Sequence, residues 1–196
     1  MMRTRAECVE GMNDTEAVRK TLKDIQTCFS KKLPETTWFL KCGTALAAVF
    51  GGHIIPGDDD IDIGVLAETC PPADFVKVFD KAGFTREYFF NDKEFPMLGI
   101  VIRFSKRGVP FDCYWLYPRG RKRWWLTAPR VPHVLPAYLF EDIHNVRLLG
   151  LELPAPHPIE VYCDHMYKKY EGSYPAFGKK GEPGETLEVF PEWEIK

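Results

Sequence analysis

The sequence has 196 residues, of which 45% are hydrophobic and 14% aromatic, enough for a globular domain with a sizeable core. Its 26 basic and 28 acidic residues give a formal net charge of −2, which argues against nucleic-acid binding through bulk positive charge. No run of about 18 apolar residues is present, so we expect no transmembrane segment. The N-terminus lacks the apolar stretch of a secretory signal, so we expect a cytoplasmic protein.

The six cysteines are scattered along the chain and form no C-x-x-C pair, so the sequence offers no zinc spacing. We expect reduced and mostly buried thiols, in keeping with a reducing compartment. They are Cys8, Cys28, Cys42, Cys70, Cys113 and Cys163.

The first elements can be placed from capping and periodicity. We expect residues 1–12 to be a flexible N-terminal tail and residues 13–196 to form a single domain. Asn13 and Glu16 resemble a capping box, and apolar residues then recur at helical spacing as far as Leu33-Pro34. Residues 38–40 (WFL) predict a short strand, and residues 45–50 predict a short helix that ends at a Gly-Gly pair.

Residues 60–66 alternate between apolar and polar side chains, which predicts a half-buried strand. Pro71-Pro72 opens a predicted helix that closes at Gly83. Residues 97–104 and 109–117 predict a hairpin around the turn at 105–108, and a last helix is expected from Pro158 to Gly172. This order of elements predicts an α+β fold with a small mixed or antiparallel sheet flanked by helices.

Four carboxylates within five residues, Asp58, Asp59, Asp60 and Asp62, are the most unusual feature of the sequence. Asp60 and Asp62 share one face of the predicted strand, roughly 6–7 Å apart, so together they can hold one divalent cation or share two. Hard oxygen ligands favour Mg²⁺ or Mn²⁺, whose charge would offset the repulsion among the acids. Asp58 has the same parity and is a third candidate ligand, whereas Asp59 is expected to face away.

Asp112 stands alone in the apolar strand VPFDCYWLY and is the candidate partner of these acids from a second strand. Two simpler interpretations remain open. In one, the acidic stretch is a surface turn. In the other, Asp112 is an inward-facing polar residue held by backbone groups or by an arginine. An EF-hand beginning at Asp58 is excluded, because Ile63 stands where glycine is needed and Thr69 where glutamate is needed.

Gly43 and Thr44 lie at the predicted turn from strand to helix that precedes the acids. Such a turn presents backbone N–H groups to an anion, glycine allows close approach, and the threonine hydroxyl adds a hydrogen bond. We therefore predict that Gly43 and Thr44 bind phosphate.

The combination of G-T at 43–44, D-D-D-I-D-I-G at 58–64 and F-D at 111–112 resembles the LicD family, which includes fukutin and fukutin-related protein. Residues 133–158 and 162–175 are similar to further blocks of that family. The resemblance implies a nucleotidyltransferase (DNA polymerase β-like) fold. Where family members carry a basic residue and a tryptophan, this chain has Phe50 and Gly57.

The resemblance also implies a function, namely transfer of a phosphorylated alcohol such as phosphocholine or ribitol phosphate. The donor would be of the CDP type and the acceptor a glycan hydroxyl. Asp60, Asp62 and Asp112 would be catalytic, and Asp58 would join them as ligands of Mg²⁺ or Mn²⁺. Two alternatives remain open: nucleotidyl transfer from an NTP with release of pyrophosphate, and an inactive binding member of the same fold. A nucleotide-sugar glycosyltransferase fits less well, because no nucleotide-binding βαβ half precedes the acids.

Two further features are a basic, tryptophan-containing stretch and the set of histidines. Residues 117–130 combine five basic side chains with Trp124 and Trp125, either as an arm for donor phosphates or an anionic glycan, or as a solvated loop whose tryptophans are in the core. The five histidines show no metal-binding spacing and are expected to be structural or exposed.

Overall fold

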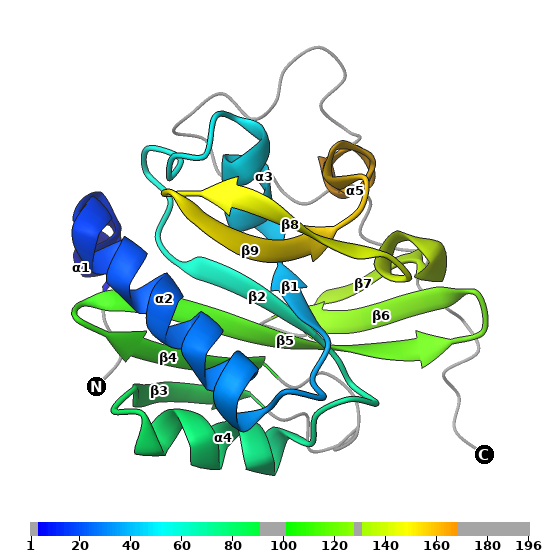
Figure 1. The fold of residues 1–196 in the computed structure, drawn as a ribbon, viewed down its shortest axis with the longest axis horizontal. Coiled ribbons are helices and arrows are strands. Elements are labelled where there is room, and N and C mark those ends of the chain that lie inside the picture. Colours follow the sequence, from blue (N-terminus) through cyan, green and yellow to red (C-terminus); the bar gives the residue numbers. More distant parts are fainter. Residues whose placement is uncertain (1–3, 91–100, 128–130, 168–196) are drawn as a thin grey trace.

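The structure is a computed structural model that describes residues 4–90, 101–127 and 131–167, and it is a mixed α/β arrangement (Figure 1). Its elements in chain order are α1 (Arg5–Asn13), α2 (Thr15–Lys32), β1 (Trp38–Leu40), α3 (Cys42–Val49), β2 (Ile61–Leu66), α4 (Pro72–Lys81), β3 (Thr85–Phe90), β4 (Val101–Lys106), β5 (Val109–Arg119), β6 (Lys122–Thr127), β7 (Val131–Pro136), the 3₁₀ helix η1 (Ala137–Phe140), β8 (Ile143–Leu148), β9 (Leu151–Pro156) and α5 (Ile159–Tyr167).

Seven strands form one mostly antiparallel sheet, in the order β1-β2-β5-β4-β3, with β6 pairing the far end of β5 and β7 pairing β6. β2 and β5 run parallel, which makes the sheet mixed as predicted. The α+β class is therefore confirmed. The predicted strands at 38–40, 60–66 and 109–117 and the helix after Pro71 all form. The predicted strand at 97–104 is present from Val101, and its residues 97–100 lie outside the described residues. The last helix forms from Ile159, and its predicted end at Gly172 lies outside the described residues.

The prediction of a flexible tail over residues 1–12 is wrong for most of that segment, because Arg5–Asn13 forms α1. Thr4 caps this helix and Glu7 completes a capping box. Cys8 and Met12 are each 2% exposed, and a Cβ on Gly11 would lie 2.2 Å from the carbonyl oxygen of Gly108. Tertiary contact with the β4–β5 turn therefore holds a segment whose apolar residues are few. The prediction of a single domain over 13–196 includes residues outside the described ranges and stays a prediction.

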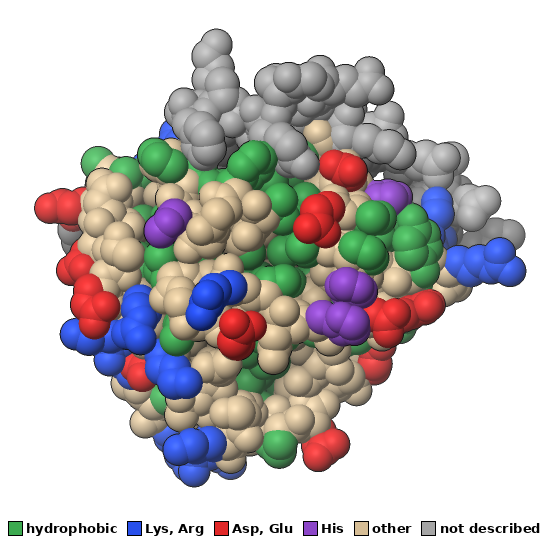
Figure 2. Space-filling model, turned by 45° about the horizontal axis from the view of Figure 1, so that its top comes forward, with side chains coloured by type: hydrophobic (Ala, Val, Ile, Leu, Met, Phe, Trp, Pro, Cys, Tyr) green, Lys and Arg blue, Asp and Glu red, His purple; other side chains and the backbone are tan. Residues whose placement is uncertain are grey.

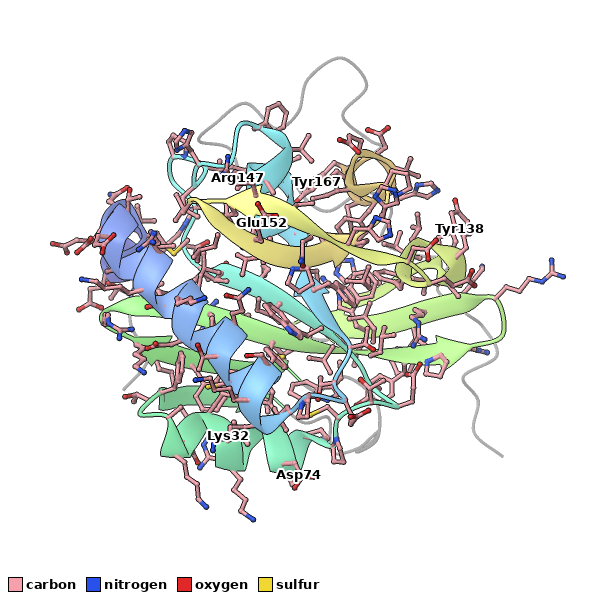
Figure 3. The ribbon with its side chains drawn as sticks, viewed as in Figure 1. Lys32, Asp74, Tyr138, Arg147, Glu152 and Tyr167 are labelled. Carbon is pink, nitrogen blue, oxygen red and sulfur yellow. The ribbon has the colours of Figure 1, made fainter. Side chains whose placement is uncertain are left out.

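α2 and α4 cover the apolar face of the sheet (Figure 1). Phe75 of α4 stacks on Phe79, meets Trp115 of β5 edge-on at 5.0 Å between ring centroids, and contacts Phe29 of α2. Charged side chains such as Lys32 and Asp74 lie on the outer surfaces of the same helices (Figure 3). The sheet face opposite these aromatic rings carries the acids.

β2 is buried on both faces rather than half-buried, because the molecule has material on both sides of the sheet. On the acidic face, the ring of Phe39 packs directly over Gly64. A Cβ on Gly64 would lie only 2.3 Å from that ring, so this face of β2 is covered. α3, α5 and the β8–β9 hairpin lie beyond this part of the sheet (Figure 1). An alternating pattern predicts the two faces of a strand but not whether the polar face reaches water.

The tryptophans of the basic stretch (residues 117–130) are buried, as the interpretation with tryptophans in the core predicts. Trp124 and Trp125 of β6 are 6% and 1% exposed. Arg123 is held by Glu68 through two hydrogen bonds from its guanidinium. Residues 128–130 of this stretch lie outside the described residues.

The β8–β9 hairpin carries an exposed polar surface. Arg147 and Glu152 face one another across it, with 3.9 Å between Nε and Oε1 (Figure 3). The rings of His144 and His157 stack with 4.0 Å between centroids. Figure 2 shows histidine side chains side by side on the surface of the molecule. Among the described residues, no histidine belongs to a group of three or more potential metal ligands.

Candidate metal and phosphate site

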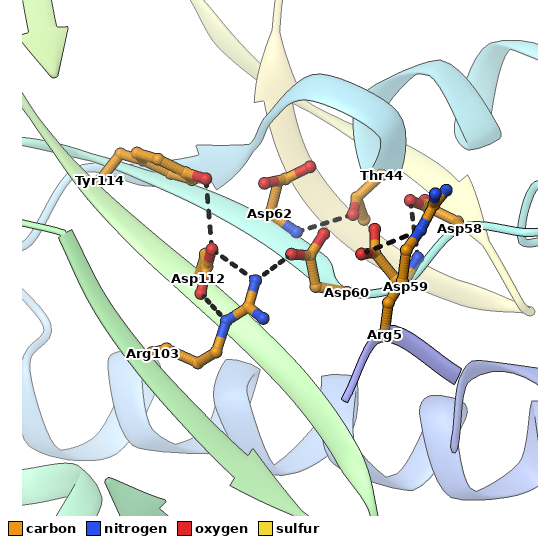
Figure 4. Close-up of polar contacts among 9 residues, drawn as sticks. All are labelled: Arg5, Thr44, Asp58, Asp59, Asp60, Asp62, Arg103, Asp112 and Tyr114. Carbon is orange, nitrogen blue, oxygen red and sulfur yellow. Dashed lines mark hydrogen bonds and ion pairs between the residues drawn. The ribbon is translucent and has the colours of Figure 1, made fainter. Parts of the chain in front are cut away.

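The site is built on the start of β2 and on the strands beside it (Figure 4). Asp62 pairs with Asp112 in the parallel β2–β5 register, and Asp112 pairs with Arg103 in the antiparallel β4–β5 register. Lys41 donates its backbone N–H to the carbonyl oxygen of Asp62 and so continues the β1–β2 register. Side chains of paired residues share one face of a sheet. Four strands therefore bring a row of charged residues to one face: Lys41, Asp62, Asp112 and Arg103.

Asp58, Asp59 and Asp60 lie in the segment that leads into β2. Each offers a carboxylate oxygen, and these three oxygens lie within 4.8 Å of one another. The prediction that Asp59 faces away is wrong, since Asp59 is 8% exposed and its Oδ2 lies 3.7 Å from Nε of Arg5 on α1. Residues before a strand have no fixed alternation, so parity cannot place them. Arg5 belongs to the segment that was expected to be a tail.

Arg103 joins the two strands that carry the acids. Its Nε and Nη2 donate to Oδ1 and Oδ2 of Asp112, at 2.6 and 2.8 Å, and the same Nη2 donates to Oδ2 of Asp60. Tyr114 also donates its hydroxyl to Oδ2 of Asp112, at 3.3 Å. Asp112 is therefore held by an arginine, as the simpler interpretation predicted, and it also lies beside the other acids of the site.

Burial raises the pKa of Asp60 well above its usual range, with further increases from the charges of Asp62 and Asp112. Arg103 offsets part of this increase. Burial, with Asp112 as the next cause, also raises the pKa of Tyr114, so its phenol remains a hydrogen-bond donor. The carboxylates are thus crowded enough that one of them resists ionisation.

Gly43 and Thr44 lie in the first turn of α3, which begins three residues earlier than predicted. A Cβ on Gly43 would lie 2.8 Å from Oδ2 of Asp58, so glycine is what lets this carboxylate approach the helix. Thr44 is fully buried, and its hydroxyl oxygen accepts the backbone N–H of Asp62 at 2.8 Å. This hydrogen bond ties α3 to the acidic strand. Phosphate binding by Gly43 and Thr44 stays a prediction.

Lys41 is a fully buried cation on the other side of Asp62 from Arg103. Its Nζ lies 4.4 Å from the centroid of the Tyr114 ring, 4.1 Å from that of Trp125, and 3.0 Å from Sγ of Cys42. Cation–π contacts of this kind stabilise an ammonium group away from water. Cys42 itself has a φ of +44°, an uncommon value for a residue with a Cβ, at the sharp turn from β1 into α3.

The residues present fit a hard divalent cation. Asp58, Asp59 and Asp60 supply closely spaced carboxylate oxygens, the donor type preferred by Mg²⁺ and Mn²⁺. The raised pKa of Asp60 shows that the surrounding side chains only partly stabilise its ionised form, which a bound cation would favour.

Residues 35–158 match the family model of the LicD/FKTN/FKRP nucleotidyltransferase domain. The chain belongs to the LicD family. Membership makes it a relative of transferases that act on phosphorylated groups, and the expected resemblance is confirmed. The matched segment contains the acidic stretch, Arg103 and Asp112. A comparison with curated proteins found no match.

The sequence predicted the acids of this LicD-family site but missed their basic partners. Arg103 was detectable as a charge between apolar residues in the run VIRF, next to the strand of Asp112. Lys41 was detectable in the same way, between an apolar strand and the G-T pair.

Among the helices that the structure describes, none has the length and apolar character of a membrane span.

Proposed function

We propose that this protein is a metal-dependent transferase that moves a phosphorylated alcohol from a CDP-type donor to a glycan hydroxyl. The observation that carries the proposal is the register that brings Asp62 of β2 beside Asp112 of β5, with Asp60 joined to Asp112 through Arg103. Family membership supports the transfer of a phosphorylated group. The mixed sheet, in which α3 leads into the acidic strand, supports the nucleotidyltransferase-like fold as part of the same proposal.

Asp58, Asp60, Asp62 and Asp112 are the proposed metal ligands, with Mg²⁺ or Mn²⁺ as the cation. When bound, the cation would neutralise the diphosphate of the donor and so favour departure of the nucleotide. The protein's own contribution is to hold these carboxylates in place before the donor arrives. Thr44 does this for Asp62 by accepting its N–H, and Gly43 does it for Asp58 by leaving space.

The acceptor hydroxyl must give up a proton as it attacks phosphorus, and a carboxylate of the site would receive it. Asp112 is the proposed base, and its orientation is fixed by Arg103 and Tyr114. Asp60 has the raised pKa, so it would retain such a proton more readily. Comparing Asp60→Asn with Asp112→Asn in the pH dependence of turnover would separate the two assignments.

The experiment is incubation with a panel of CDP-alcohols and CTP, with Mg²⁺ and candidate glycan acceptors, read for CMP and pyrophosphate. Release of CMP supports transfer of a phosphorylated alcohol, whereas pyrophosphate from CTP indicates nucleotidyl transfer instead. Asp62→Ala should abolish turnover, while Asp80→Ala, which alters an exposed carboxylate of α4, should leave it unchanged. Full activity of Asp62→Ala, or in excess EDTA, would contradict the proposal. Metal-coupled nucleotide binding without any turnover would identify an inactive binding member.

A further inference from the structure

Arg103 occupies the space between two of the proposed metal ligands. Nη2 contacts Oδ2 of Asp60 and Oδ2 of Asp112, so one nitrogen bridges carboxylates from β2 and β5. The side chain of Arg103 is 24% exposed, and those of Asp60 and Asp112 are 10% and 11% exposed. A cation that bridges these two acids would have to take the position of this guanidinium.

The lone pairs of Asp112 lead to the same conclusion. A carboxylate offers about four acceptor positions, two on each oxygen. Oδ2 of Asp112 receives Nη2 of Arg103 and the hydroxyl of Tyr114, and Oδ1 receives Nε of Arg103 at 2.6 Å. Three of the four positions are therefore filled by protein donors, and two of these bonds form the bidentate pair that arginine makes with a carboxylate.

The position of Arg103 is fixed by the fold rather than by a flexible loop. Arg107 and Gly108 both have positive φ, at +54° and +85°, as in a two-residue hairpin turn. That turn pairs Lys106 with Val109, and the register then places Arg103 opposite Asp112. The guanidinium thus comes from the strand beside the acid, at a position set by the turn.

Asp58, Asp59 and Asp60 supply three oxygens within 4.8 Å of one another, and Asp60 is the member of this group that Arg103 also contacts. The segment before β2 thus supplies three carboxylates that could hold one cation. Asp59 of this group also lies near the exposed Arg5, at 3.7 Å, whereas the guanidinium of Arg103 lies directly between Asp60 and Asp112. The part of the site around Asp58–Asp60 is therefore the part suited to a metal ion.

We infer that Arg103 takes the place of a second metal ion, so that this site binds one divalent cation through the Asp58–Asp60 segment while Asp112 is held by arginine instead of metal. The inference rests on the proposed metal-dependent function, and it removes Asp112 from the proposed set of metal ligands. Two-metal phosphoryl-transfer sites hold their ions about 3.5–4 Å apart to stabilise attacking and leaving oxygens. In this protein Arg103 would supply one of those two charges permanently.

The test is a titration of the full chain with Mn²⁺, followed by electron paramagnetic resonance of free and bound Mn²⁺. The wild-type protein should bind one Mn²⁺ with no spin coupling between ions. Arg103→Met should bind two, with the signature of a coupled pair, because Asp60 and Asp112 lose their cation. Saturating Mn²⁺ should also raise the melting temperature of Arg103→Met more than that of the wild type.

Arg123→Met is the matched control, because Arg123 also donates two hydrogen bonds to a carboxylate, that of Glu68 beyond the other end of β2. The Arg123→Met variant should still bind one Mn²⁺. Arg103→Gln repeats the test with a neutral side chain that can still donate to one carboxylate, in case the methionine variant fails to fold. Two bound ions in the wild type, or one in both Arg103 variants, would overturn the inference and leave the proposed function standing. No bound Mn²⁺ in the wild type would instead remove the proposed metal dependence itself.

Discussion

Replacing Gly43 with alanine tests whether the close approach of α3 to the acidic segment serves metal binding. The new Cβ would lie 2.8 Å from Oδ2 of Asp58, whereas ordinary contacts begin near 3.4 Å. The atom in the way is the end of a side chain, so the carboxylate has to move by about 0.6 Å, while metal–ligand distances tolerate only about 0.2 Å. Gly43→Ala should therefore displace one ligand without disrupting the sheet.

The expected magnitude is a 10- to 100-fold loss of Mn²⁺ affinity, comparable with the loss of a group that orients a ligand and equal to about 1.4–2.8 kcal/mol. Gly43 lies in the first turn of a helix and its φ is not positive, so alanine is tolerated by the backbone. Without metal, the variant should be about as stable as the wild type, or up to ~1 kcal/mol more stable, because alanine favours helix. A loss of binding together with retained stability separates this effect from misfolding.

The assay is isothermal titration with Mn²⁺ together with thermal unfolding in EDTA, and Asp58→Ala supplies the matched background. If alanine at position 43 acts through Asp58, it should have little further effect once that carboxylate is removed. Wild-type affinity in Gly43→Ala, or an equal loss of affinity in the Asp58→Ala background, would refute the reasoning.

Two further predictions concern the buried surroundings of the site. Thr44→Val should lower the free energy of unfolding by about 1–3 kcal/mol, because the buried N–H of Asp62 loses its acceptor, while Thr44→Ser should retain most of the stability in urea unfolding. Burial, assisted by Lys41, lowers the pKa of His133 to about 3, so the folded state binds fewer protons than the unfolded state below pH 6.5. The wild type should therefore lose about 2 kcal/mol of stability between pH 7 and pH 5 that His133→Gln does not lose. Equal losses in urea titrations of both proteins at the two pH values would contradict this assignment.

Local sequence patterns determined about half of the elements, whereas the strands β3, β6, β7, β8 and β9 were not predicted. The alternation of residues 60–66 and the apolar spacing of α2 and α4 were sufficient because each depends on neighbours within a few residues. α1 also had a local signal, the Thr4–Glu7 capping box, but few apolar residues follow it. What holds α1 is packing against the β4–β5 turn, a contact between distant parts of the chain.

The candidate site divides in the same way. Sequence alone assembled the acids, because their spacing and the isolated Asp112 are visible in one dimension, and it matched them to the LicD family. It did not decide how the acids are compensated, because that depends on strand order and register. The parallel pairing of β2 with β5 and the two positive φ angles at Arg107 and Gly108 bring Arg103 between Asp60 and Asp112. Opposite charges from three strands meet only when the sheet is formed, so the tertiary structure alone could show that a protein cation occupies part of the acidic site.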